Sequence, residues 1–282
     1  MLSFLQKYDT MTLYVRGCAL LLSRRKTAMI YDLQRANMWK HISAYLLDAI
    51  LLGMVVVGFA FLLSGIVGYD SYSEELEAAY DRYEAEYGMS FDMTAAEYEA
   101  LDEQQLAIFE QASEAFSRDE EVIRVYSMLI SLTVLITVFS ILAGYLLLEF
   151  AVPLFFKNGQ TLGKKIFGIA VMHTNGVKLS TPMLFARTVL GKYTVETMIP
   201  VMIVILVYFN MMGFFGTLLL MILGFVQVML LILTHTRSPI HDLVAKTVTV
   251  DFASQMIFDS EEALLAYKTK LHEEKARRAE YP

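Results

Sequence analysis

Residues 149–165 read EFAVPLFFKNGQTLGKK, and this stretch decides the fold class of the chain. It begins at the end of an apolar segment that carries a carboxylate, Glu149, and passes directly into a turn with two adjacent lysines. A second apolar stretch ends near Thr234, and the polar sequence RSPIHDLVAKT follows at 237–247. Apolar segments that run into basic turns are typical of a chain leaving a membrane.

The composition agrees with this interpretation. Over 282 residues, 56% are hydrophobic and 19% are charged, and the mean hydropathy is +0.48. A soluble domain has about 45 to 50% apolar and about 25% charged residues. Segments at about 42–68, 126–156, 194–212 and 214–234 approach or exceed the roughly 20 apolar residues that cross a bilayer. The sequence therefore predicts an all-α polytopic membrane protein with four transmembrane helices.

The chain ends differ from the membrane domain that we expect over 36–252. Residues 1–35 alternate apolar and basic side chains, which predicts an amphipathic helix on the bilayer surface, although a frayed tail fits the same pattern. Residues 253–282 form a charged segment that we expect to be helical. The single cysteine, Cys18, excludes a disulfide within the chain.

An acidic insertion follows the first span, at 70–121. Two pairs in it have the spacing of capping boxes, and Gly88 separates the two predicted helices. These pairs are Ser71 with Glu74 and Thr94 with Glu97. The insertion carries nearly all of the acidic excess behind the net charge of −7, so no nucleic-acid partner is implied. It is either a cap that binds a partner or a cation outside the membrane, or a solvated insertion whose acids keep it soluble.

Basic residues mark the side of the membrane that we expect to face the cytoplasm. They precede the first span and fill the connection between the second and third spans. In that connection they are Lys157, Lys164, Lys165, Lys178, Arg187 and Lys192. The positive-inside rule then places both termini in the cytoplasm. Such a collar suits anionic phospholipid headgroups, at about 1 kcal/mol per basic residue.

A small cytoplasmic β element is predicted between the second and third spans. The pair Asn175-Gly176 lies between the apolar runs 166–173 and 177–179, which indicates a β-hairpin. The β-branched run at 247–250 would add a third strand. Ser180 or Thr181, followed by proline, predicts the start of a short interfacial helix that carries Arg187.

The glycine turn is not a nucleotide-binding loop. Gly159 and Gly163 enclose three residues, whereas a P-loop needs four and then Gly-Lys followed by Ser or Thr. We expect these glycines to let backbone segments pass closely at the membrane surface.

Several blocks together resemble the RDD family, which is named for one arginine and two aspartates. They are WKHISAYLLD at 39–48, the turn with Gly159, Thr161 and Gly163, the helix of Arg187, and HDLVAKTV at 241–248. The resemblance covers about 36–252, outside the acidic insertion. The family's arginine falls on His41 here, beside Lys40, and histidine titrates near neutral pH. The resemblance implies a transporter of the bacterial cell membrane, with exchange of Na⁺, K⁺ or Li⁺ for protons as its activity.

Ionisable residues inside spans are costly and mark candidate functional sites. Asp48, Glu149 and Glu196 are such residues, and all lie toward the cytoplasmic side. One hypothesis is that Asp48 and Glu149 bind a proton or a monovalent cation, while Arg187, Lys164 and His41 tune their pKa values. The alternative is that Asp48 pairs with Arg187 or Lys40 to lock helix packing. Asp242 would then cap backbone amides or pair with a basic residue.

Two classes of function remain open at this stage. The first is the transporter, for which we expect a homodimer packed through glycines of the first span: Gly53, Gly58, Gly65 and Gly68. The second is an adaptor that does not transport and holds partners through its acidic cap or its tail. We expect no enzyme and no cofactor, because hydrolytic motifs are missing and the histidines lack metal-ligand spacing.

Overall fold

The computed structural model describes residues 33–156, 158–209, 211–233 and 239–280. Most of the predicted amphipathic segment 1–35, with Lys157 and Thr234, therefore lies outside the described residues. The chain divides into two compact units, Gly53–Gly144 and a unit formed by Met1–Leu52 with Tyr145–Pro282.

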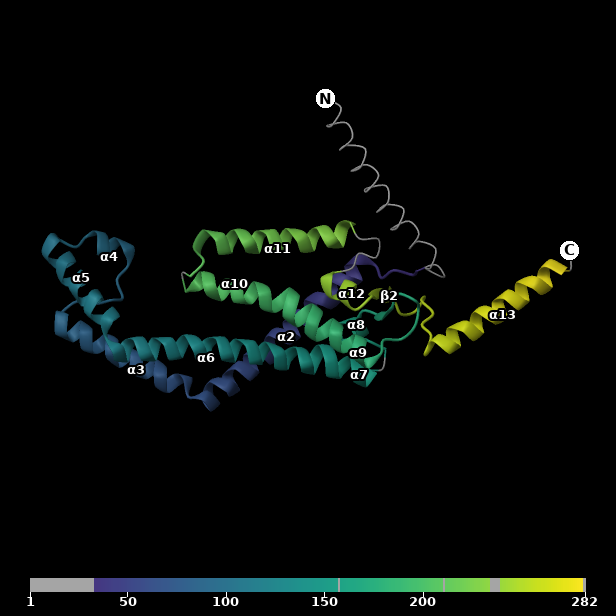
Figure 1. The fold of residues 1–282 in the computed structure, drawn as a ribbon, viewed down its shortest axis with the longest axis horizontal. Helices are drawn as coiled ribbons and strands as arrows, with labels where there is room; N and C mark the ends of the chain where they lie inside the picture. The colour runs from purple at the N-terminus through teal and green to yellow at the C-terminus, as the bar shows by residue number, and fades with distance from the viewer. Residues whose placement is uncertain (1–32, 157, 210, 234–238, 281–282) are drawn as a thin grey trace, which may run out of the picture. The chain divides into compact units, whose positions relative to one another are not determined.

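Four helical segments in the described residues are long and apolar enough to cross a membrane (Figure 1). They confirm the predicted fold class. The first is α2 (Met38–Val67), and the second joins α6 (Glu120–Tyr145), η2 (Leu146–Ala151) and α7 (Val152–Phe156). The third joins α9 (Thr181–Phe185), η3 (Ala186–Met198) and α10 (Ile199–Tyr208), and the fourth is α11 (Gly213–Leu233). The segments η2 and η3 are π-helices, and α10 lies beside α11.

The third span begins earlier than the sequence predicts. Ser180 and Pro182 start the helix as expected, but it continues without a break to Tyr208. Arg187 therefore lies inside the span, and its expected place on a short interfacial helix is wrong. The physical reason is that Arg187 and Lys192 have buried ionic partners. The spanning helix can therefore include these charged residues and need not begin after them.

The insertion contains three helices in place of the predicted two. They are α3 (Tyr69–Tyr87), α4 (Ala95–Glu99) and α5 (Glu103–Arg118). The capping box of Thr94 and Glu97 is present, and Asp102 with Gln105 forms another. Ser71 does not cap a helix, because α3 already begins at Tyr69 after Gly68.

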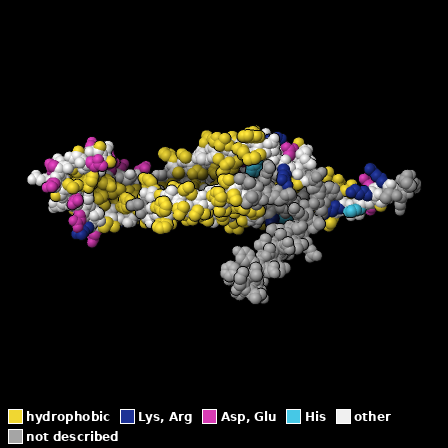
Figure 2. Space-filling model, turned by 90° about the horizontal axis from the view of Figure 1, so that it is seen from above, with side chains coloured by type: hydrophobic (Ala, Val, Ile, Leu, Met, Phe, Trp, Pro, Cys, Tyr) yellow, Lys and Arg dark blue, Asp and Glu magenta, His cyan; other side chains and the backbone are white. Residues whose placement is uncertain are grey.

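Aromatic rings pack against one another between the helices of the insertion. The rings of Tyr80 and Phe116 stack at 4.6 Å, and Phe91 lies 5.4 Å from Phe116. Gly88 ends α3 with a φ of 66°, as its place in the sequence predicts. On the face shown in Figure 2, acidic side chains gather over this segment, while hydrophobic side chains cover the spans.

The predicted β element exists, but its pairing differs from the expectation. Strand β1 (Ile169–His173) pairs antiparallel with β2 (Thr247–Asp251), which comes from the far end of the domain. The chain does turn at Asn175-Gly176, where Gly176 N–H donates to His173 O at 2.9 Å. The returning segment then forms an isolated bridge from Val177 to Phe258, outside the sheet.

A short helix precedes each strand. Helix α8 (Leu162–Ile166) leads into β1, and α12 (Ile240–Val244) leads into β2. After the sheet, α13 (Glu261–Glu280) forms the predicted helical tail, and Tyr267 of this helix packs against Phe258 at 5.3 Å.

The start of the membrane domain is attached to its end. The ammonium of Lys40 lies 2.8 Å from Asp251 Oδ2, and Asp251 N–H donates to Gln34 O at 3.0 Å. Arg35 also forms a bridge with Val250. The beginning of α2 and the end of β2 are therefore held together.

Candidate functional site

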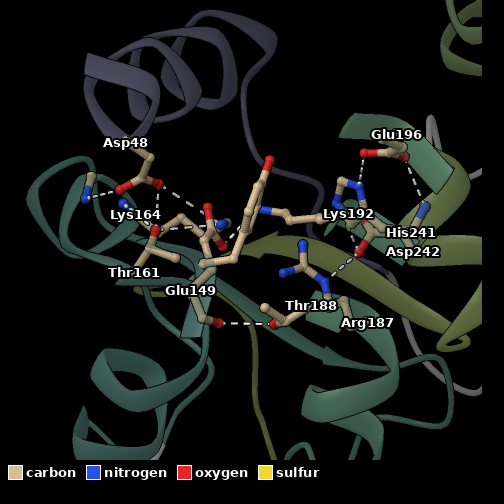
Figure 3. A network of polar contacts seen from close by, with 12 residues as sticks. Asp48, Glu149, Thr161, Lys164, Arg187, Thr188, Lys192, Glu196, His241 and Asp242 are labelled. Atoms are coloured by element: carbon tan, nitrogen blue, oxygen red, sulfur yellow. Dashed lines mark hydrogen bonds and ion pairs between the residues drawn. The ribbon is translucent and has the colours of Figure 1, made fainter. Parts of the chain in front are cut away.

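Buried ionisable side chains from both ends of the domain meet in one polar network (Figure 3). The carboxylates come from α2, η2, η3 and α12, and the cations come from α8 and η3. The carboxylates are Asp48, Glu149, Glu196 and Asp242, and the basic residues are Lys164, Arg187, Lys192 and His241. The predicted site residues Asp48, Glu149 and Glu196 all belong to it.

Asp48 holds the start of α8. Its Oδ2 accepts a hydrogen bond from the hydroxyl of Thr161, and its Oδ1 accepts one from Gly163 N–H at 2.7 Å. The ammonium of Lys164 is 3.9 Å from Oδ2 and donates to Thr161 Oγ1 at 3.3 Å. The partner of Asp48 is therefore α8, and the partners considered from sequence, Arg187 and Lys40, bind other carboxylates.

Glycine is required at position 163 because α8 touches α2. A Cβ atom at Gly163 would lie 2.9 Å from Asp48 Cγ and closer still to the carbonyl oxygen of Ala44. Gly159 is also tightly placed: its φ is +66°, and a Cβ there would lie 2.8 Å from Leu179 Cδ1. The turn from Gly159 to Gly163 thus carries the close backbone contacts that bring Asp48 to α8.

Glu149 pairs with Lys192 inside the membrane domain. Glu149 Oε2 and Lys192 Nζ are 2.6 Å apart, and both side chains are buried. The hydroxyl of Thr188 donates to the main-chain oxygen of Glu149 at 2.9 Å. These contacts join η2 to η3, and π-helices of this kind are frequent at functional sites.

Arg187 and Asp242 form the most deeply buried pair. Arg187 Nε lies 2.8 Å from Asp242 Oδ1, and each side chain is only 2% exposed. The hydroxyl of Thr247 donates to the same oxygen at 2.6 Å. Burial alone would raise the pKa of Asp242, but the guanidinium of Arg187 holds it well below its usual range. Asp242 therefore pairs with a basic residue, as one of the sequence interpretations had it.

Glu196 binds His241 through two contacts. Its Oε2 lies 2.6 Å from His241 Nδ1, and its Oε1 accepts from His241 N–H at 2.9 Å. On the other side of the ring, Nε2 is 3.7 Å from Asp242 Oδ1. Burial lowers the pKa of His241, while the two neighbouring carboxylates oppose that effect.

The two adjacent lysines of the glycine turn have opposite environments. Lys165 is exposed, and its ammonium lies 3.7 Å from the centre of the Phe156 ring. Lys164 is buried, and its pKa is lowered to about 8. Burial is the largest cause, Lys192 and Arg187 act in the same direction, and Glu149 and Asp48 oppose them. Lys164 is thus poised to lose its proton close to neutral pH.

Sequence reasoning missed some of these residues and misplaced others. Lys192 is one of the basic residues expected at the cytoplasmic surface, yet it is buried and pairs with Glu149. His241 has no metal-ligand spacing in the sequence, and here it is held by Glu196. Lys40 lies outside the network, and His41 is within electrostatic reach of Lys164 and Asp242. The sequence places Lys192 four residues before Glu196, but it carries no signal that Lys192 pairs with Glu149.

The sequence was compared with models of known protein families. A family model described as the RDD family matches residues 35–246. The chain belongs to the RDD family. Within this RDD protein, the matched region contains every residue of the network, from Asp48 to Asp242. No curated protein and no solved structure matches the chain.

The RDD network consists of charged side chains that are paired and largely buried. Its carboxylates face the cations of Lys164, Arg187 and Lys192, and the charges balance when His241 also carries a proton. Among the described residues, no group of three or more His, Cys, Asp and Glu side chains could hold a metal ion. Because an unpaired buried charge is strongly destabilising, any ion that enters must replace a proton or another cation.

Proposed function

We propose that this RDD membrane protein exchanges monovalent cations for protons. Asp48 and Glu149 serve as the cation ligands, and Lys164 is the group that gives up its proton. The observation that carries the proposal is the place of Lys164, a buried ammonium that interacts with both carboxylates and whose pKa is about 8. A base with a pKa near the working pH suits reversible proton transfer.

The exchange conserves charge in the site. While Lys164 is protonated, its ammonium neutralises the two carboxylates together with Lys192. When Lys164 loses its proton, one negative charge remains uncompensated, and a monovalent cation can enter beside the carboxylate oxygens. Carboxylate and carbonyl oxygens are the ligands that hard cations prefer. One proton therefore leaves for each cation that binds.

A membrane location with several spans and cytoplasmic termini belongs to the same proposal. The site then opens toward the cytoplasm, and exposed basic residues such as Lys165 contact anionic headgroups. We also propose a homodimer through α2, in which Gly53, Gly58 and Gly65 pack against the second copy. A Cβ atom at any of these glycines meets no described atom within 4 Å.

Reconstituted vesicles provide the test. The purified protein is inserted into vesicles with a pH-sensitive dye inside, and Na⁺, K⁺ or Li⁺ is added against a pH gradient. We expect the internal pH to change with at least one cation, and we expect Asp48→Asn to abolish the change. Asp251→Asn is the matched control, because Asp251 pairs with Lys40 outside the network. Vesicles that show no response to any of the cations would contradict the proposal.

One observation favours a second function, that of an adaptor. Helix α13 extends from the domain with most of its side chains exposed, and in its described part only Leu264 is buried. A charged exposed helix can hold a partner protein. Removing residues 261–280 separates the two functions: a transporter keeps its cation response, whereas an adaptor loses its partner and never shows a response.

A further inference from the structure

The two short helices and their strands form the same motif twice. In the first motif, α8 is followed by β1, and in the second α12 is followed by β2, each element having five residues. The elements keep one spacing: α12 starts 78 residues after α8 (240 minus 162), and β2 starts 78 residues after β1 (247 minus 169). The agreement extends to the residue between helix and strand, which is where the backbone is most unusual.

That connecting residue has a left-handed conformation in both motifs. Gly168 has a φ of 65°, and Lys246, again 78 residues later (246 minus 168), has a φ of 53°. Lys246 is the only non-glycine residue with positive φ among those the structure describes. A lysine in a conformation that favours glycine shows that the second motif keeps the geometry of the first even where its sequence does not suit it.

The strand pairing has the register that a two-fold axis requires. Val171 lies opposite Thr249, and these residues are equivalent under the same spacing. On either side, Ile169 lies opposite Asp251 and His173 lies opposite Thr247. Under the same spacing, Ile169 is equivalent to Thr247 and His173 to Asp251. The two pairs are therefore interchanged when the two motifs are exchanged. This is the isologous contact of a two-fold symmetric pair, with the axis passing between Val171 and Thr249.

The carboxylates of the site follow the same relationship. Asp48 accepts from the N–H of Gly163, the second residue of α8, at 2.7 Å. Glu196 accepts from the N–H of His241, the second residue of α12, at 2.9 Å. Each carboxylate thus comes from a span and holds the start of one short helix.

The packing beside these carboxylates is also equivalent, with the large and small residues exchanged. In the first motif the glycine is on the short helix, and Gly163 fits against Ala44, four residues before Asp48. In the second motif the glycine is on the span, and Gly191, five residues before Glu196, leaves room for His241. The position that is glycine in one motif therefore carries an imidazole in the other.

We infer that the network is a pair of two-fold related ion sites, and that the second of them, formed by Glu196 and His241, binds a proton. The inference rests on the proposed function only in calling the Asp48 site a cation site. In the first site, Lys164 follows the glycine of α8, whereas in the second site Asp242 follows His241. The second site therefore has an additional acid where the first has a base.

Charge explains why a proton belongs there. Glu196 and Asp242 flank the imidazole of His241, and Arg187 pairs with Asp242. While His241 is neutral, Glu196 and Asp242 carry one more negative charge than Arg187 balances. A proton on the imidazole ring neutralises this charge. The groups that face His241 are Glu196, Arg187 and Lys192 from η3, Asp242 from its own helix and His41 from α2. Because the Glu196 carboxylate can only accept, Nδ1 carries a hydrogen even in the neutral ring. The added proton therefore binds Nε2, which lies 3.7 Å from Asp242 Oδ1.

Nuclear magnetic resonance tests the proton site directly. The full-length protein is labelled with ¹⁵N-histidine in lipid nanodiscs, and the His241 signal is assigned by its loss in His241→Gln. Because burial lowers the pKa of His241, we expect this signal to pass from imidazole to imidazolium as the pH falls below the ordinary histidine pKa of about 6.5. Glu196→Gln should lower the midpoint by at least about one pH unit, because the carboxylate no longer favours the charged ring. Asp251→Asn should leave the midpoint unchanged.

A flux measurement keeps the inference testable if Glu196→Gln does not fold. In vesicles, the pH dependence of exchange should contain two steps, and His241→Gln should remove the more acidic one. A His241 signal that does not titrate, or a midpoint that Glu196→Gln leaves in place, would overturn the inference. If the wild-type protein carries no cation but His241 titrates with Glu196, the exchange proposal fails while the proton site stands.

Discussion

Gly191 and His241 touch so closely that a Cβ atom on the glycine would lie 2.6 Å from the Cα of His241. We predict that Gly191→Ala pushes α12 away from η3 and weakens the contact of Glu196 with His241. Overpacking of this kind costs about 1 to 3 kcal/mol, so the thermal unfolding midpoint in detergent should fall by several degrees. Gly224→Ala is the control, since a Cβ there meets no described atom within 4 Å. Equal midpoints for the two variants would refute the prediction.

Asp48→Asn separates an ion ligand from a packing residue. We predict loss of exchange with a stability loss smaller than the about 3 to 5 kcal/mol typical of a broken buried pair. The reason is that Lys164 can either lose its proton or, while charged, remain stabilised by Glu149. Flux and thermal unfolding are measured on the same preparation. A large loss of stability that Lys164→Met restores would show that Asp48 serves packing alone.

The pair of Glu149 and Lys192 is expected to matter more for stability. Glu149→Gln leaves the buried ammonium of Lys192 without its partner at 2.6 Å, and we predict a loss of about 3 to 5 kcal/mol. The double variant Glu149→Gln with Lys192→Met should recover most of it. Gln227→Leu, in α11 and outside the network, is the control. The stability of each variant is measured by thermal unfolding in detergent. A stability loss in the double variant equal to the sum of the two single losses would contradict the prediction.

Lys164→Arg tests the proton carrier. The pKa of Lys164 is about 8, so its charge is present below that pH and lost above it. We therefore predict that cation exchange rises severalfold as the pH increases from about 7 to about 9. Arginine stays charged throughout this range, so the variant should show a flat profile there. A profile equal to that of the wild type would assign the proton to another group.

Cysteine labelling tests the proposed orientation. In a Cys18→Ser background, Ala100→Cys in the acidic insertion should react with an impermeant maleimide on intact cells. Thr174→Cys, which is exposed beside β1, should react only after lysis. The expectation follows from the basic residues near β1 and the acidic residues of the insertion. The reverse pattern would place the ion network at the outer side.

Local sequence patterns predicted the elements, and contacts between distant segments decided the site. Hydropathy was sufficient to predict the four spans. The capping box at Thr94 could be predicted from the spacing of Thr94 and Glu97. The run at 247–250 was expected to add a third strand, but its direct pairing with β1 was not readable, because two further spans separate the two strands in sequence. Glu196 lies four residues after Lys192 in the sequence, a spacing that favours an ion pair on an α-helix. The structure instead pairs Lys192 with Glu149 and Glu196 with His241, and both of these partners are distant in sequence.

The contact of Lys40 with Asp251 brings the beginning of α2 and the end of β2 together. The polypeptide enters at the start of α2 and leaves at the end of β2, and both junctions lie at the same point of the molecule. Any length of chain can be added before the first junction or after the second without being threaded past the buried charges. Segments added outside the residues that contact the domain can therefore be changed in engineering while the network stays the same, and after β2 these contacts extend to Phe258.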